Sequence, residues 1–181
     1  MRQKIIALVE SITPYDDLEG LQIKEALDWL RSEAEIFRLE KPAIPPKHLV
    51  AYFMLIDRIE KKILLVDHKK AELWLPSGGH VEPGEHPHFT VEREIEEELR
   101  CEAKFIYEVP FFLTITSTVG QGITHTDVSL WYLMEGNIHQ PLNFDQREFY
   151  SIQWFAFDDV PYSRTDPHMK RFIKKLKTTL F

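Results

Sequence analysis

The sequence predicts a mixed α/β domain preceded by a helical extension. Apolar residues recur at helical spacing before residue 45, whereas after residue 48 they form the short runs typical of buried β-strands. One short segment between these runs carries an unusual number of carboxylates. The chain has 181 residues, of which 44% are hydrophobic, and this is enough for one sizeable core. The sequence contains no internal repeat.

The first 45 residues are expected to be helical. Leu8, Val9 and Ile12 form a short apolar face that ends before a proline. Asp16 or Asp17 is expected to cap a second helix. Its apolar positions follow the i, i+3, i+4 pattern: Ile23, Ala26, Leu27, Leu30, Ala34 and Phe37. Three prolines between residues 42 and 46 cannot continue a helix, so a boundary is placed near residue 45.

We interpret residues 1–45 as a helical hairpin and proline-rich linker covering part of a main domain, residues 46–181. An alternative is a dimerisation arm, which would make the protein a homodimer, or a lid over the active site. The segment carries no polar cluster that would support a catalytic role.

The main domain is expected to contain strands over residues 49–56, 63–67, 72–75, 103–107, 111–117, 126–134 and 151–157. Gly120, Gln121 and Gly122 supply a turn between two of them. Asp166 or Pro167 opens a final helix. Its apolar residues are expected to face inward and its lysines to stay in solvent: Phe172, Ile173 and Leu176 on one side, and Lys170, Lys174, Lys175 and Lys177 on the other.

Composition excludes several classes of function. The net charge of -7 argues against a protein that binds nucleic-acid polymers or acidic membranes, because such surfaces are basic. Cys101 is the one cysteine, so no internal disulfide forms and a reducing compartment is indicated. The apolar run after Met1 is too short for a signal peptide, and no stretch approaches transmembrane length. We therefore expect a cytoplasmic protein.

The carboxylate-rich segment is the main clue to function. A helix from about Pro87 to Leu99 would place Glu94, Glu97 and Glu98 on one face. Like charges spaced i, i+4 destabilise a helix, and so do carboxylates in its last turn. A divalent cation would reverse both effects, because oxygen ligands clustered in one turn suit Mg²⁺.

This segment resembles the Nudix box of MutT-like hydrolases, G-x5-E-x7-R-E-U-x-E-E-x-G-U, in which U is aliphatic. The matching positions are Gly79, Glu85, Arg93, Glu94, Ile95, Glu97 and Glu98. The resemblance covers roughly residues 48–178 and implies an α/β/α sandwich with a mixed sheet. It also implies Mg²⁺- or Mn²⁺-dependent hydrolysis of a small substrate, a nucleoside diphosphate linked to another moiety.

The resemblance assigns roles to the box residues. Glu97 and Glu98 would be the principal metal ligands, and Glu94 a further ligand or the general base. Arg93 would pair with Glu85 or a neighbouring carboxylate and hold it in place. A main-chain carbonyl around Gly78 would complete the metal shell.

Outside the box, further candidates remain open. Asp145 and Glu148 are acidic residues in a late loop, and Glu148 is the better placed as an additional ligand; the alternative is that both only solvate the loop. His125 and Asp127 follow a glycine-containing turn, where substrate contacts are expected, although such a histidine is more often structural.

Other polar and aromatic residues could also contact the substrate. Arg164 and His168 flank a polar run that could bind a phosphate, but Asp166 in that run also fits an ordinary helix cap. Trp74, Phe112 and Trp131 could stack on a base or pack in the core.

One box position departs from the pattern. Arg100 stands where the box has its last glycine, a position expected to need positive φ at the helix end. This substitution is the one sequence feature that supports a second hypothesis, a Nudix-fold module that binds or senses nucleotides with little catalysis. A third hypothesis is an isomerase resembling the Nudix-fold isopentenyl diphosphate isomerases, which use a cysteine and a glutamate; Cys101 would be its candidate acid.

Overall fold

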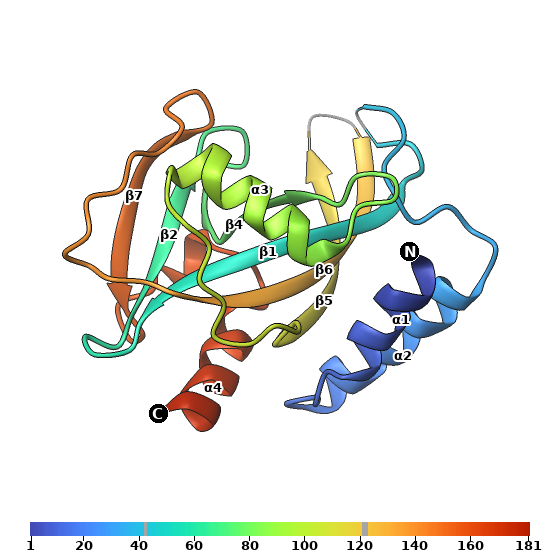
Figure 1. The fold of residues 1–181 in the computed structure, drawn as a ribbon, viewed down its shortest axis with the longest axis horizontal. Helices are drawn as coiled ribbons and strands as arrows, with labels where there is room; N and C mark the ends of the chain where they lie inside the picture. The colour runs from blue at the N-terminus through green and yellow to red at the C-terminus, as the bar shows by residue number, and fades with distance from the viewer. Residues whose placement is uncertain (42, 121–122) are drawn as a thin grey trace.

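The computed structural model describes residues 1–41, 43–120 and 123–181 (Figure 1). The helices are α1 (Arg2–Glu10), α2 (Asp17–Arg31), α3 (Pro87–Leu99) and α4 (Met169–Leu180), with a 3₁₀ turn at Tyr162–Arg164. The strands are β1 (Lys47–Asp57), β2 (Lys62–His68), β3 (Leu73–Leu75), β4 (Ser77–His80), β5 (Phe112–Gly120), β6 (Ile123–Glu135) and β7 (Phe149–Ala156).

The strands form one mixed sheet in the order β3-β2-β1-β6-β5, while β4 pairs with β1 and β7 with β2. β1 and β6 are parallel, and every other pairing among the described strands is antiparallel. β1 is almost continuously apolar because both of its faces are buried. The predicted mixed sheet is therefore confirmed.

Helices cover both faces of this sheet. On β1, Leu49 and Phe53 contribute to a core shared with α1, α2 and α3. Met54 and Ile56 face the other way, into a core shared with α4. Alternate residues of a strand point to opposite faces, so this one strand supports both layers. The result is the expected α/β/α sandwich, with α3 in front of the sheet in Figure 1.

Several local predictions were wrong. Residues 103–107 form no strand; Phe105 makes only an isolated bridge to Met134. β4 was not predicted, because two of its four residues are glycine. α2 ends at Arg31, since Ser32 is extended, so Ala34 lies outside the helix. The turn predicted at Gly120, Gln121 and Gly122 is not among these, because Gly120 ends β5 and Gln121 and Gly122 lie outside the described residues.

The final helix also differs from its prediction. It begins at Met169, and Lys175 is buried instead of lying in solvent. Its Nζ donates to Glu19 Oε1 at 2.8 Å and to the Thr13 carbonyl at 2.7 Å. Glu19 is itself fully buried. Helical spacing could not reveal this, because the partner is supplied by a helix at the other end of the chain.

A second ion pair links the same two helices. Arg171 Nε donates to Asp16 Oδ2 at 2.8 Å, while Asp16 Oδ1 caps α2 through the Glu19 N–H. Asp16 is therefore the cap, as predicted. The N-terminal helices pack on the main domain through these contacts; the boundary near residue 45 stays a prediction. Within the described ranges, no helix is long and apolar enough to cross a membrane.

We expect the Asp16–Arg171 pair to contribute stability that is lost in acid. The hydrogen bond from Arg171 lowers the pKa of Asp16 from 3.8 to about 2. A carboxyl with a lowered folded-state pKa stabilises the fold above its unfolded pKa, so the contribution disappears as pH falls from about 4 to 2. Asp16→Asn keeps the cap but loses the charge. It should cost about 1 kcal/mol at pH 7, after allowance for partial exposure, and almost nothing at pH 2. Urea unfolding at both pH values measures the difference, and an equal cost at both would contradict the assignment.

Candidate active site

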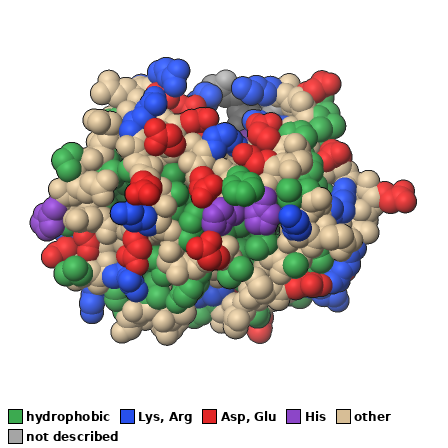
Figure 2. Space-filling view, viewed as in Figure 1, with side chains coloured by type: hydrophobic (Ala, Val, Ile, Leu, Met, Phe, Trp, Pro, Cys, Tyr) green, Lys and Arg blue, Asp and Glu red, His purple; other side chains and the backbone are tan. Residues whose placement is uncertain are grey.

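Helix α3 carries the carboxylates on a face that adjoins its apolar stripe. Val91, Ile95 and Leu99 are buried against the sheet. The helix begins after His86, whose Nδ1 accepts the His88 N–H at 3.2 Å, and Pro87 occupies the first turn, where its missing N–H costs nothing. Acidic side chains consequently gather over α3 on this face of the molecule (Figure 2).

The glycine segment of β4 passes in contact with these carboxylates. Gly78 has φ +139°, and a Cβ there would overlap the Ala51 carbonyl and lie 2.8 Å from Tyr52 Cα. A Cβ on Gly79 would overlap the carboxylate of Glu94. Both glycines are needed because the backbone lies directly against β1 on one side and α3 on the other.

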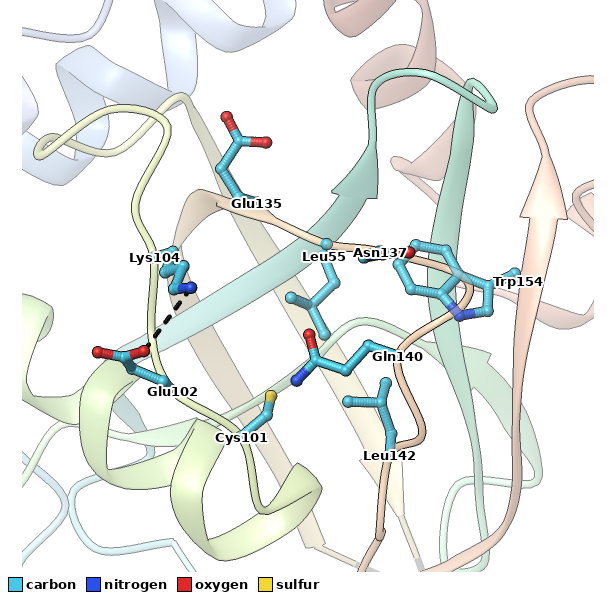
Figure 3. Close-up of a pocket in the computed structure, with 10 residues that line it drawn as sticks. Leu55, Cys101, Glu102, Lys104, Glu135, Asn137, Gln140, Leu142 and Trp154 are labelled. Carbon is cyan, nitrogen blue, oxygen red and sulfur yellow. Dashed lines mark ion pairs between the residues drawn. The ribbon is translucent and has the colours of Figure 1, made fainter.

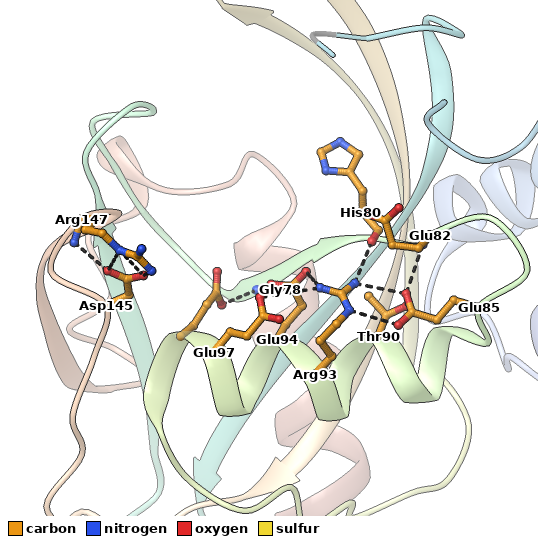
Figure 4. A network of polar contacts seen from close by, with 11 residues as sticks. Gly78, His80, Glu82, Glu85, Thr90, Arg93, Glu94, Glu97, Asp145 and Arg147 are labelled. Atoms are coloured by element: carbon orange, nitrogen blue, oxygen red, sulfur yellow. Dashed lines mark hydrogen bonds and ion pairs between the residues drawn. The ribbon is translucent and has the colours of Figure 1, made fainter. Parts of the chain in front are cut away.

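Arg93 organises the network beside the glycines (Figure 4). Its guanidinium donates to Glu85 through Nε and Nη2, both at 3.1 Å, and to Glu94 Oε1 through Nη1 at 2.6 Å. Nη2 also lies 3.3 Å from the His80 carbonyl. Glu85 further accepts from the hydroxyl of Thr90 at 2.8 Å. Arg93 therefore ties the loop before α3 to the helix and fixes one oxygen of Glu94.

The three carboxylates that share one face of α3, those of Glu94, Glu97 and Glu98, differ in burial. Glu98 is 7% exposed and accepts the Gly78 N–H at 3.1 Å through Oε2. Burial and the neighbouring charge of Glu94 raise the pKa of Glu98 to about 9. Burial also raises the pKa of Glu94. The side chain of Glu97 is 62% exposed and lies 3.9 Å from Arg93. The cluster thus runs from the protein interior to solvent.

This donor set fits a hard divalent cation. Two crowded, largely buried carboxyls are costly as anions without compensation, and the raised pKa values of Glu94 and Glu98 express that cost. A divalent ion would supply the missing positive charge, and oxygen donors are those that Mg²⁺ and Mn²⁺ prefer.

The two late-loop candidates lie near the end of α3, where the Asp145 N–H donates to the Glu98 carbonyl at 2.8 Å. Asp145 pairs with Arg147, with Nε 3.0 Å from both carboxylate oxygens, away from the α3 group in Figure 4. Glu148 is exposed, and its negative charge contributes to the raised pKa values of both Glu94 and Glu98. The side chain of Asp145 is therefore held by Arg147, whereas the charge of Glu148 acts on the carboxylates of α3.

The four residues predicted to contact the substrate do not lie together in the structure. His125 and Asp127 lie on β6 beside His48, with His125 Nε2 3.5 Å from Asp127 Oδ1. Arg164 donates to Asp67 at 3.2 Å and to the Glu72 carbonyl.

His168, the fourth, lies at the start of α4, with Nδ1 2.9 Å from Arg171 Nη1. Phe112 and Trp131 are buried in the core, so neither can stack on a base, whereas Trp74 is partly exposed.

His48 and His80 join this region without having been predicted. His48 is fully buried at the start of β1, and its Nε2 lies 3.0 Å from His80 Nε2. Burial lowers the pKa of His80 to about 3, and the positive charge of Arg38 contributes. Two features of the sequence could have indicated these residues. His48 directly precedes an apolar strand, and His80 lies inside the box.

Arg100 adopts the backbone conformation that the box glycine would supply. It ends α3 with φ 51° and ψ 40°, in the left-handed region. The expectation of positive φ at this position is therefore confirmed. The helix ends with the same left-handed residue that a glycine would provide, but the side chain of Arg100 makes this conformation strained.

We expect Arg100→Gly to stabilise the fold slightly. Glycine removes a strain of about 1 kcal/mol, and its greater freedom in the unfolded chain offsets part of that, leaving about 0.5 kcal/mol. The thermal midpoint should rise by about 1–2 °C in calorimetry. Glu102→Gly, two residues later and without positive φ, serves as the control and should lower the midpoint. A thermal midpoint for Arg100→Gly below that of the parent would contradict the interpretation that the backbone of Arg100 is strained.

Cys101 belongs to a different part of the surface. It is half-buried, burial raises its pKa, and it borders a pocket of about 70 Å³ with Gln140, Leu142 and Trp154 among its walls (Figure 3). None of the box glutamates lines that pocket. Cys101 is therefore not placed with the box glutamates in that pocket, whose acidic residues are Glu102 and Glu135.

Comparisons with known proteins agree with this geometry. The NUDIX domain family model matches residues 47–176. A NUDIX-family hydrolase from Clostridium perfringens superposes with a TM-score of 0.57 at 18% identity, covering 72% of this chain and 97% of that one. A MutT NUDIX hydrolase from Burkholderia pseudomallei gives 0.54 at 21% identity, covering 71% and 96%. The E. coli dihydroneopterin triphosphate pyrophosphohydrolase gives 0.54 at 12% identity, covering 77% and 99%.

A search of curated proteins finds no match. The solved structures named above share the fold with this chain, and the family model spans well over half of its length. Together with the box on α3, the match shows that the chain belongs to the Nudix family of hydrolases, enzymes that act on phosphoric anhydride bonds.

Proposed function

We propose that this chain is a metal-dependent pyrophosphohydrolase that cleaves the diphosphate linkage of a nucleoside diphosphate joined to another moiety. The observation that carries the proposal is the convergence of Glu94, Glu97 and Glu98 on one face of α3, beside the backbone of Gly78. We assign the ion to Glu97, Glu98 and the Gly78 carbonyl, with Glu94 and Glu148 as further ligands. The substrate contacts predicted at His125, Asp127, Arg164 and His168 remain part of the proposal.

The residues divide the chemical work. Mg²⁺ or Mn²⁺, when bound, would neutralise the diphosphate oxygens and lower the pKa of the attacking water. Arg93 is a positioning residue: it holds Glu94 by one oxygen and Glu85 by two, so the orientation of Glu94 is set before substrate binds. Glu94 serves as a ligand or as the group that accepts the proton from water. The Gly78 N–H orients Glu98.

A substrate panel tests this proposal. Oxidised nucleoside triphosphates, ADP-ribose, nucleotide sugars and dinucleoside polyphosphates are incubated with the full chain and Mg²⁺ or Mn²⁺, and released phosphate or pyrophosphate is measured. We expect turnover of at least one class that stops with a chelator and in Glu97→Gln, whose exposed side chain should not affect folding. Turnover that survives both treatments would contradict the proposal.

The alternative, a binding module with little catalysis, rests on Arg100. The structure weakens that support, because Arg100 reaches the same backbone conformation as a glycine and the carboxylates are all present. In the same panel, tight binding of a nucleotide with no turnover of any class would favour the module.

The N-terminal helices could also mediate a homodimer. Leu18 and Leu21 on α2 are exposed, at 43% and 65%, and would supply an apolar contact. Sedimentation of the parent and of Leu21→Glu measures this, and a monomer in both would exclude a dimer through this surface.

A further inference from the structure

Three histidines and an aspartate meet at one end of the sheet. His48 and Asp127 are direct neighbours across the parallel β1–β6 pair, and His125 lies two residues before Asp127 on the same face of β6. His80, on β4, is opposite Val50, which shares a face with His48. The four side chains therefore project from the same face of the sheet although they come from three strands.

Their polar atoms have the spacing of a coordination shell. His48 Nε2 lies 3.1 Å from Asp127 Oδ1 and 3.0 Å from His80 Nε2, and His125 Nε2 lies 3.5 Å from the same Asp127 oxygen. One donor atom from each of His48, His125 and Asp127 lies within 4.8 Å of the others. Donors around tetrahedral zinc, with bonds of about 2.0–2.1 Å, are about 3.4 Å apart.

The hydrogen-bond pattern leaves a place for a cation. His48 Nδ1 lies 2.9 Å from the Pro45 carbonyl oxygen, which can only accept, so Nδ1 carries the hydrogen. In neutral His48, Nε2 then carries a lone pair, which lies 3.0 Å from His80 Nε2 and 3.1 Å from Asp127 Oδ1. Asp127 is 6% exposed, and its Oδ1 accepts no hydrogen bond from the described residues. A buried oxygen left in this way is costly. A metal ion would satisfy the Asp127 oxygen, and ligating histidines commonly donate their other N–H to a carbonyl.

We propose that His48, His125 and Asp127 bind a divalent transition-metal ion of the zinc class, with His80 as the fourth neighbour. Imidazole nitrogen with one carboxylate suits zinc, whereas Mg²⁺ prefers oxygen donors alone. This role for His125 and Asp127 is an alternative to the direct substrate contact proposed for these two residues.

The site is distinct from the carboxylate site. Gly79 faces Glu94, and the adjacent His80 side chain must point to the other side of the strand. Figure 4 shows its ring directed away from α3. Bound there, the ion would join β1, β4 and β6 and hold His80, whose carbonyl faces Arg93 at 3.3 Å. The ion would thereby stabilise the position of Gly78 and Gly79 from the face of β4 opposite α3.

Cobalt substitution tests the site without using activity. The full chain is stripped with a chelator and titrated with Co²⁺, and visible d–d absorption reports nitrogen and oxygen ligation. We expect one tightly bound ion per chain, displaced by Zn²⁺. Asp127→Asn and His125→Gln should weaken Co²⁺ binding by about 100-fold or more, since even indirect partners of a metal site change affinity about 10–100-fold.

Two control variants locate the ion. His139→Gln changes an exposed histidine far from the cluster in sequence, and Glu98→Gln disables the carboxylate site. Both should keep the cobalt spectrum. The parent protein decides the question even if Asp127→Asn or His125→Gln fails to fold: no Co²⁺ or Zn²⁺ uptake by the parent overturns the site. Undiminished binding in folded Asp127→Asn and His125→Gln, or loss of the spectrum in Glu98→Gln, overturns it as well.

Discussion

Glu98→Gln is expected to lower the rate of diphosphate hydrolysis by about 100- to 1,000-fold, the usual cost of removing a central electrostatic group from an active site. Glutamine keeps the shape of the side chain and can still accept the Gly78 N–H. It cannot become an anion, so one ligand of the proposed metal site is lost. Steady-state kinetics with saturating Mg²⁺ measure the effect.

The same variant should not destabilise the protein. Glu98 is buried beside Glu94, and an uncharged amide removes the repulsion between the two carboxylates. The thermal midpoint should stay equal or rise. Glu96→Gln is the matched control, because Glu96 lies on the same helix but is exposed, and it should change neither rate nor midpoint. An unchanged rate in Glu98→Gln would remove Glu98 from the catalytic site.

Gly78→Ala is expected to have the largest effect on folding. The residue has φ +139°, which alanine rarely adopts, and the added methyl would overlap the Ala51 carbonyl. The neighbour is backbone of the central strand and cannot move without disrupting its pairing with β4. We expect a loss of about 4 kcal/mol, and a midpoint lower by about 10 °C or more.

Gly84→Ala is a control that introduces backbone strain at positive φ without the steric overlap expected for Gly78→Ala. Gly84 also has positive φ, at 80°, but a Cβ there meets no atom within 4 Å among the described residues. Its cost should be confined to backbone strain, about 1 kcal/mol. Equal midpoints for Gly78→Ala and Gly84→Ala would show that the close approach of β4 to β1 is not what requires glycine at position 78.

The predictions that succeeded concern local sequence. The helix that carries Glu94, Glu97 and Glu98 follows from a spacing of three and four residues and from the apolar stripe beside it. Positive φ at Arg100 follows from the end of that same helix. Such features depend on neighbours in the chain, so one sequence contains the information.

The predictions that failed, and the residues that were missed, depend on partners far away. His48 lies beside Asp127 only because β1 and β6 run parallel, and nothing in either strand specifies the other. Lys175 looks like a solvent-exposed helix residue until Glu19 is placed against it. Residues 103–107 have the residue pattern of a strand, but they pair with the edge of the sheet only through the isolated bridge from Phe105 to Met134.

The ion pairs between α2 and α4 also bear on how the chain folds as it is made. Arg171 and Lys175 follow their partners Asp16 and Glu19 by 155 and 156 residues. During synthesis α2 leaves the ribosome well before α4, so its carboxylates emerge before the side chains that pair with them. Glu19 gains its buried cationic partner Lys175 only after α4 has emerged, so the packing of α2 is completed after that of the sheet.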